Sequence, residues 1–368
     1  MNNKKLLSKL QLTFFVIQAQ IGVGLLSLPY VVHIHAKSDG WISVIIAGIS
    51  VLFFMFIMWS LGKRFPNDTI YEYTNKIAGK YLGTFISFLY VLNFFIVSIF
   101  VVVITVNVLK KWILTFTPPY VIILCIVGTG VYLGRENLKV IGRFFTFVSI
   151  LILFLVFLEL LSYKDTNYKY LFPIGQAGFK NIMIGSHDSL MAMLGFESLL
   201  VIYPFVKGNQ KDILKCSTIA VTFVAVLYTF FVITSYIVFS PEEITIVSEP
   251  ILYMLKALSY EVVERLDLIF LSIWVVPIIT SFVTYLHITS VGAGKIFKQP
   301  KNHKKITLLL GILITIISII IPQEDQFIDK FNLLVSYSSY LFIAFIPLTL
   351  LIVSIIRNKK EQSYLYEN

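Results

Sequence analysis

The feature that most constrains this chain is a succession of apolar runs, each about as long as one crossing of a lipid bilayer. One helical crossing takes about 20 predominantly apolar residues. Such runs recur almost from end to end, and 57% of the 368 residues are hydrophobic. Only a lipid solvent removes the need for a polar exterior at this composition. The chain is therefore predicted to be an all-α polytopic membrane protein.

The apolar runs predict ten transmembrane helices. Their approximate bounds are 11–33, 40–62, 82–109, 118–134, 141–163, 181–206, 216–240, 265–292, 305–321 and 334–356. The fourth and ninth are short, whereas the third and eighth are long enough to be tilted. No linker divides the chain, so we expect a single transmembrane domain over residues 1–368 that ends in a short cytoplasmic tail, 357–368.

Charged residues in the connections predict the orientation. The net charge is +10, but the basic residues lie in short loops between apolar runs, including Lys4, Lys5 and the group within 295–305. This pattern favours an orientation signal and not a nucleic-acid surface. The positive-inside rule then places both termini in the cytoplasm. The connection 241–264 is acidic, with Glu261 among its carboxylates, and its stretch PILYMLKAL predicts a short helix over the outer face.

Two of the runs contain residues that interrupt helices. Residues 21–30 read IGVGLLSLPY, which places Gly22, Gly24 and Pro29 inside the first run. Gly costs roughly 1 kcal/mol relative to Ala inside a helix, and Pro roughly 3 kcal/mol. The sixth run is the most polar and contains Gly185, His187, Asp188, Gly195 and Glu197. Because unwound backbone in lipid must find partners, both breaks predict an adjoining cavity, ligand or ion.

The positions of the two breaks predict an inverted repeat. The first and sixth runs each begin a set of five, about 11–163 and about 181–356, and an odd number inverts the second set in the membrane. The two interrupted helices then face each other near the midplane. At such a break, a helix N-terminus favours an anionic group and a helix C-terminus favours a cation. Two facing breaks could therefore hold both charges of a zwitterionic amino acid. A kinked helix with glycines for close packing is the alternative for IGVGLLSLPY.

Several motifs resemble one protein family. The segment Gly22-Val23-Gly24-Leu25-Leu26-Ser27-Leu28-Pro29 resembles the first-helix signature of the amino acid–polyamine–organocation transporter superfamily. It is closer still to the spore-germination permeases, the B subunits of nutrient germinant receptors. Further matches are Gly195-Phe196-Glu197, Glu249-Pro250-Ile251, Leu255-Lys256-Ala257-Leu258 and Glu264-Arg265-Leu266-Asp267 followed by Trp274. The resemblance extends over about 8–356.

The resemblance implies a ten-helix fold of the LeuT type, with five-plus-five inverted repeats and discontinuous first and sixth helices. It also implies a complex with A-type and C-type receptor subunits in the spore inner membrane or cell membrane. In that complex a small nutrient, commonly an amino acid, binds the pocket and triggers germination. The third and eighth helices of this architecture flank the pocket.

The candidate ligand-binding residues come from four runs. They are Gly22, Val23, Gly24, Leu25, Phe94, Ser98, Gly195, Phe196, Glu197, Thr280, Ser281 and Thr284. A carboxylate in mid-membrane is functional by default, so Glu197 is expected to contact the ligand ammonium or to serve as a structural or gating partner. Phe196 forms a pocket wall or packs in the core. The hydroxyl groups orient a ligand or form interhelical hydrogen bonds.

Other polar residues have separate interpretations. His187 and Asp188 lie two turns before Gly195 and are gating candidates, or they line a wetted outer vestibule. Glu159 is expected to be solvated at the outer interface, and Glu264, Arg265 and Asp267 to form a salt-bridged collar. The histidines and the two cysteines show no metal-ligand spacing or disulfide framework, so no metal and no cofactor are expected.

The predicted fold is compatible with more than one function. A ligand sensor binds a germinant from outside and biases a two-state helix arrangement that partner subunits detect. An active secondary transporter uses the same pocket with alternating access. An intramembrane enzyme lacks support, because no catalytic nucleophile–base pair is recognisable. The sequence favours the sensor, with the amino acid permease as the alternative.

Overall fold

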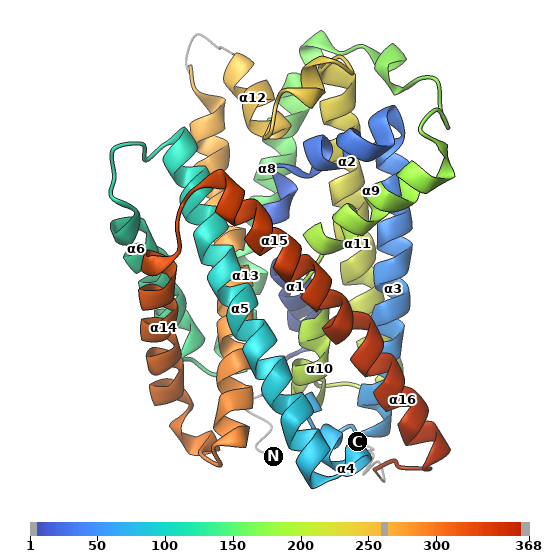
Figure 1. Cartoon of the computed structure of the whole chain (residues 1–368), viewed down its shortest axis with the longest axis vertical. Helices are drawn as coiled ribbons and strands as arrows, with labels where there is room; N and C mark the ends of the chain where they lie inside the picture. The colour runs from blue at the N-terminus through green and yellow to red at the C-terminus, as the bar shows by residue number, and fades with distance from the viewer. Residues whose placement is uncertain (1–5, 259–263, 362–368) are drawn as a thin grey trace.

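The structure is a computed structural model that describes residues 6–258 and 264–361. Lys4, Lys5, Glu261 and the tail beyond residue 361 lie outside these ranges. The chain forms a bundle of long helices, with α4 (Ile70–Ala78) and the last turns of α16 (Ile346–Ile356) at one end and α12 (Pro250–Ala257) at the other (Figure 1). The end that carries α4 is called the inner end below, and the opposite one the outer end.

The described part of the chain is almost entirely helical. In chain order its main segments are α1 (Lys9–Gln20), η2 (Val23–Leu25), α2 (Leu28–Ala36), α3 (Gly40–Arg64), α4 (Ile70–Ala78), α5 (Lys80–Trp112), α6 (Pro119–Gly134), α7 (Leu138–Val148), α8 (Ile150–Leu160), η4 (Leu161–Asp165), α9 (Gly178–Ala192), η6 (Phe196–Ser198), α10 (Leu199–Ile202), α11 (Gln210–Val238), α12, α13 (Leu266–Ile296), α14 (His303–Ile320), α15 (Asp325–Tyr340) and α16 (Ile346–Ile356). A π-helical turn, Leu341–Phe345, joins α15 to α16.

Seven helices of the described ranges are long and apolar enough to cross a membrane, and eight if the bent pair Gly178–Ala192 and Phe196–Phe205 counts as one span. Each of the ten predicted runs overlaps helical backbone, and the fourth run lies on α6, an apolar helix of only 16 residues. The polytopic all-α class is confirmed. The number of crossings stays a prediction.

The most enclosed helices form the middle of the bundle. α13 packs along α5, and α1 packs against α7, α11 and α13. Outward faces of α3 and α5 expose large apolar side chains such as Phe53 and Phe88, as expected for surfaces that meet acyl chains. α9 packs against both α2 and α3. The helices of the two interrupted runs therefore lie within the bundle, together with α5 and α13.

Two predictions about the outer end are confirmed. The stretch PILYMLKAL contains the helix α12, whose Ile251, Leu252 and Leu255 are fully buried. Arg265 forms a bidentate pair with Asp267, with its Nε 2.9 Å from Oδ1 and its Nη2 2.7 Å from Oδ2. The predicted collar is thus present for Arg265 and Asp267, whereas its third predicted member, Glu264, is exposed and has no ion pair among the described residues.

The expected interfacial solvation of Glu159 is wrong. The helix does not end there, because η4 continues it beyond α8, and α8 packs against α12 and α13. Glu159 is 0% exposed, and its carboxyl oxygens have no hydrogen-bond partner among the described residues. The carboxyl group is therefore an uncompensated polar group inside the outer half of the bundle.

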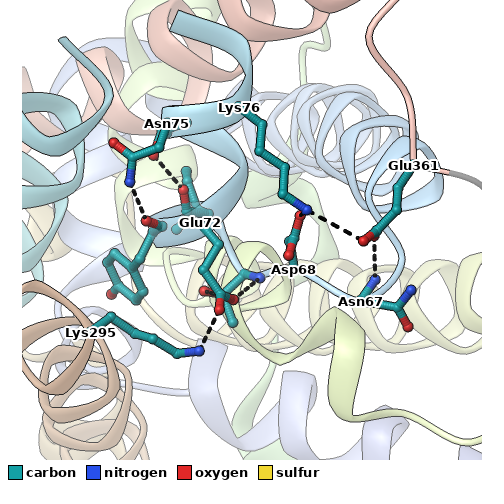
Figure 2. A network of polar contacts seen from close by, with 11 residues as sticks. Asn67, Asp68, Glu72, Asn75, Lys76, Lys295 and Glu361 are labelled. Atoms are coloured by element: carbon teal, nitrogen blue, oxygen red, sulfur yellow. Dashed lines mark hydrogen bonds and ion pairs between the residues drawn. The ribbon is translucent and has the colours of Figure 1, made fainter. Parts of the chain in front are cut away.

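A helix that the apolar runs did not predict closes the inner end. α4 is short and amphipathic, and its capping box pairs Thr69 with Glu72. Figure 2 shows the polar network around it: Lys76 Nζ lies 2.5 Å from Asp68 and 3.3 Å from Glu361, and Lys295 pairs with Glu72. Burial raises the pKa of Asp68, although the hydrogen bond with Lys76 opposes that rise. The network ties α4 to α13 and to the C-terminal segment.

Candidate functional site

The first predicted interruption is present in the structure. α1 ends at Gln20, Gly22 has extended backbone, and a single 3₁₀ turn, η2, precedes α2. Pro29 lies in the first turn of α2, where its missing N–H costs nothing. IGVGLLSLPY is thus the junction between two helices and not a kink within one.

The second interruption lies within the sixth run. α9 ends at Ala192, and the chain resumes helical form at η6, bent by 52°. Gly195 has φ +129°, a backbone conformation that only glycine adopts readily. The Gly195 N–H donates to Glu197 Oε2 at 2.7 Å, so the residue two positions later stabilises the break.

The two breaks are in direct contact. The Gln20 side chain donates to the Met193 carbonyl at 2.9 Å. The Tyr228 hydroxyl, from α11, donates to the Gln20 carbonyl at 3.0 Å and approaches the Ala192 carbonyl at 3.4 Å. The Gln20 carbonyl at the end of α1 therefore obtains a donor from α11, and the Met193 carbonyl of the second break obtains one from the Gln20 side chain. These hydrogen bonds offset part of the penalty for unwinding in an apolar interior.

α13 supplies most of the remaining support. Thr280 donates to Gln18 Oε1 at 2.6 Å, and Ser281 donates to the Ala19 carbonyl at 3.1 Å. The Tyr285 hydroxyl donates to Glu197 Oε1 at 2.6 Å. Both oxygens of Glu197 are therefore used within the protein, and this carboxyl group is 3% exposed.

Substitution of Tyr285 by Phe is expected to destabilise the protein. It removes the donor to Glu197 Oε1 and leaves a buried acceptor unpaired, which costs about 1–3 kcal/mol. Thermal unfolding of the detergent-purified protein should show a lower midpoint. Tyr132→Phe is the matched control, because the Tyr132 side chain is 82% exposed. Equal midpoints for the two variants would contradict the structural role of this hydroxyl.

A cavity of about 170 Å³ lies between the two breaks. Its lining includes Gly22, Val23 and Gly24 of the first break and Met191, Ala192 and Leu194 of the second. α5 and α13 supply further walls, through Val97, Phe100, Val101, Ile104, Ser281 and Tyr285. The volume exceeds the roughly 10–15 Å³ that one water needs and is below the 300–1,000 Å³ of drug-sized pockets. The cavity suits a small ligand.

One carboxylate, Asp188 of α9, lines this cavity. Its Oδ2 is buried and has no hydrogen-bond partner among the described residues, and it lies 3.9 Å from His35 Nε2. His187 hydrogen-bonds the Tyr340 hydroxyl through Nδ1 at 2.6 Å and stacks on that ring. The polar cluster of His35, His187, Asp188 and Tyr340 therefore combines one unsatisfied carboxylate with two imidazoles.

The structure divides the predicted ligand-binding residues into two groups. Gly22, Val23, Gly24 and Ser281 line the cavity, and so does the gating candidate Asp188. Outside its lining lie Leu25, Phe94, Ser98, Gly195, Phe196, Glu197, Thr280, Thr284 and His187. Ser98 and Thr284 donate to carbonyls of their own helices, and Phe94 packs near the Tyr285 ring.

Several lining residues were missed from the sequence. Tyr285 lies one helical turn after Ser281, so the spacing of the polar residues in this run did contain a signal for it. Gln20 and Ser27 flank the first break. Asn332 and Ser336 come from α15, whose amphipathic first half lies before the predicted start of the tenth run. They also share one face of a helix, but nothing local indicates that this face reaches the cavity.

Comparison with known proteins gives the family. The family described as "Spore germination protein" matches residues 6–328. The chain belongs to this spore germination protein family. The match covers both breaks, the cavity walls from α5 and α13, and the beginning of α15.

Members of the family are similar over nearly the whole chain. Spore germination protein YndE of Bacillus subtilis is 25% identical over 96% of this chain and 97% of its own length. Spore germination protein GerQB of Bacillus cereus is 25% identical and covers 94% of both chains. Spore germination protein A2 of Bacillus subtilis is 27% identical over 91% of this chain and 90% of its own.

Solved structures share the fold of this family member. The crystal structure of MhsT in complex with L-phenylalanine superposes with a TM-score of 0.70 at 14% identity, covering 94% of this chain and 88% of that one. A Na⁺-coupled sialic acid symporter gives a TM-score of 0.63 at 13% identity, covering 90% and 77%. The LeuT-type fold expected from the resemblance is thereby supported.

Proposed function

We propose that this chain is the nutrient-binding subunit of a spore germinant receptor and that its ligand is an amino acid. The observation that carries the proposal is the cavity between the two helix breaks, which has an unsatisfied carboxylate, Asp188, in its lining. A small zwitterion fits such a site because both of its charges need a partner where water is scarce.

The proposed contacts assign each charge of the ligand to one part of the site. The ligand ammonium pairs with Asp188, and the ligand carboxylate lies near the backbone of Gly22, Val23 and Gly24, at the beginning of η2. Ser281 orients the ligand from α13. Phe100 and Val101 form the apolar wall that selects the side chain. His187 and Asp188 form the gate on the outer side.

The proposed architecture has ten transmembrane helices in two inverted repeats, with both termini in the cytoplasm. α1 to α8 form the first repeat and α9 to α16 the second. Basic residues gather at the inner end, which supports the orientation. The proposed partners are A-type and C-type receptor subunits in the spore inner membrane, which detect the helix arrangement that the ligand favours.

Ligand-dependent thermal stabilisation tests the proposal. The purified full chain is heated with each of the common amino acids in turn. One or a few of them are expected to raise the unfolding midpoint, because a ligand at 100 times its Kd adds about 2.7 kcal/mol. Gly24→Trp should abolish that rise, since even a Cβ at Gly24 would lie 2.8 Å from Ala192 Cβ. No stabilisation by any amino acid would contradict the proposal.

Active transport is the second candidate, and the fold shared with MhsT and the sialic acid symporter favours it. Uptake of the stabilising amino acid into proteoliposomes separates the two functions. A sensor is expected to bind without accumulating label. Concentrative uptake driven by a proton or sodium gradient would instead establish a permease.

A further inference from the structure

A second hollow, which we call the inner groove, lies far from the ligand cavity at the inner ends of the helices. Its volume is about 810 Å³. The ends of α3 and α16 form its walls, the first residue of α11 adds Gln210, and the C-terminal segment adds Lys360 and Glu361. Figure 1 shows α16 beside the lower end of α3. Since both helices end here, at Arg64 and Ile356, the inner groove lies where spanning helices meet lipid headgroups.

The inner groove has one apolar side and one basic side. Phe56, Leu351 and Ile355 supply the apolar side, and Phe56 and Ile355 are 49% and 56% exposed on the outward face. Lys63, Arg64 and Lys360 supply the basic side. Trp59 lies between the two sides and donates its indole N–H to the Gln210 carbonyl at 2.8 Å. An apolar wall below a basic rim matches the two parts of a phospholipid.

The positive charge of the inner groove is not compensated within the described residues. Glu361 is the acidic residue of the lining, and Lys76 Nζ already binds it at 3.3 Å, while the Asn67 N–H donates to its second oxygen (Figure 2). Neither Lys63 nor Lys360 forms an ion pair in the described ranges; Lys63 Nζ lies 5.3 Å above the Trp59 ring. Two exposed ammonium groups therefore face the groove without a counter-charge.

Arg64 contributes a fixed guanidinium to the same rim. Its Nη2 donates to the carbonyls of Ser354 at 2.8 Å and Lys359 at 3.2 Å, which holds the C-terminal segment against α16. Carbonyl acceptors leave the charge of Arg64 in place, unlike a carboxylate. Its Nε has no partner in the described residues.

We propose that the inner groove binds an anionic phospholipid. Its phosphodiester lies between Lys63 and Lys360, and its acyl chains cover Phe56, Leu351 and Ile355. Basic pockets between transmembrane helices on the cytoplasmic side are suited to anionic headgroups. The apolar wall distinguishes this ligand from a soluble phosphate, which gains nothing from that surface.

Competition between lipids tests the proposal on the full chain in phosphatidylcholine nanodiscs. Phosphatidylglycerol is titrated into the discs, and bound lipid is counted by native mass spectrometry after release from the disc. The wild-type chain is expected to retain phosphatidylglycerol in preference to phosphatidylcholine. Lys63→Gln combined with Lys360→Gln should reduce that preference by roughly tenfold or more. Both lysines are exposed, so folding should not change.

A charge-matched control separates a site from general attraction to basic residues. Lys301→Gln combined with Lys305→Gln removes two exposed charges elsewhere in the basic stretch 295–305 and should leave the preference unchanged. An equal loss in the control would overturn the proposal, as would a wild-type chain without preference. In a second experiment, binding of glycerol 3-phosphate to the same protein is measured. Binding as tight as that of the lipid would identify a soluble phosphate site and exclude a lipid site.

Discussion

Substitution of Gly195 by Ala is expected to cause a large loss of stability. Gly195 has φ +129°, and a Cβ there would collide with the Ala19 carbonyl and lie 2.7 Å from the Gln20 amide nitrogen. These obstacles are backbone atoms of the other break, so no rotamer change relieves them. Backbone strain costs about 1–3 kcal/mol and overpacking about 1–3 kcal/mol.

Thermal unfolding and the yield of folded protein measure this effect. Gly195→Ala should lower both, to the point where little folded protein is recovered at about 3 kcal/mol or more of destabilisation. Gly128→Ala is the control, because a Cβ at that helical position in α6 meets nothing within 4 Å. The control should be neutral or slightly stabilising. Equal stability of both variants would show that the contact between the breaks is not rigid.

Asp188→Asn is expected to give the largest loss of ligand affinity. The substitution keeps the size of the side chain and removes the one carboxylate of the cavity lining, whose Oδ2 has no hydrogen-bond partner in the described residues. A charge-assisted hydrogen bond contributes about 1.5–3 kcal/mol, so the apparent Kd should rise roughly 10- to 150-fold. Protein stability should change little, since Asp188 has no hydrogen bond to lose among the described residues and its contacts with His35 and His187 are long, at 3.9 and 4.0 Å.

The measurement is the ligand concentration that gives half of the maximal thermal stabilisation. Glu242→Gln provides the control: it also removes one negative charge at the outer end, but Glu242 is exposed and lies outside the cavity lining. A loss of affinity shared by both variants would indicate a general electrostatic effect. An unchanged dose response in Asp188→Asn would remove the ammonium partner from the proposed site.

The sequence was sufficient to predict those structural elements that depend only on residues close together in the chain. Apolar run length predicted the helical class, and Gly22, Gly24 and Gly195 marked the two interruptions because helix interiors disfavour glycine. It was insufficient for α4, an amphipathic helix too short and too polar to register as an apolar run. The first half of α15 was missed because it is also too polar to register as an apolar run.

The sequence offered two alternative roles for several residues, and the choice between them depended on distant partners that it could not show. Glu197 was expected to bind a ligand or to serve a structural role, and both of its oxygens are occupied by Gly195 and by Tyr285, which is 88 positions away. Thr280 was a pocket candidate with an interhelical hydrogen bond as the alternative, and its hydroxyl forms that hydrogen bond with Gln18. The spacing and polarity of residues identify which face of a helix carries polar side chains. The partner of each side chain on that face follows only from the packing of the whole bundle.

The hydroxyl group of Tyr228 has a mechanical consequence. It reaches the carbonyls of Gln20 and Ala192 at once, so any increase in the spacing between them must lengthen one of these contacts or pull on α11. α11 has 29 residues and is about 43 Å long. Near its inner end, Asp212 is ion-paired at 2.8 Å with Lys9, at the start of α1. One continuous helix thus joins the contact between the two breaks to the inner surface of the bundle.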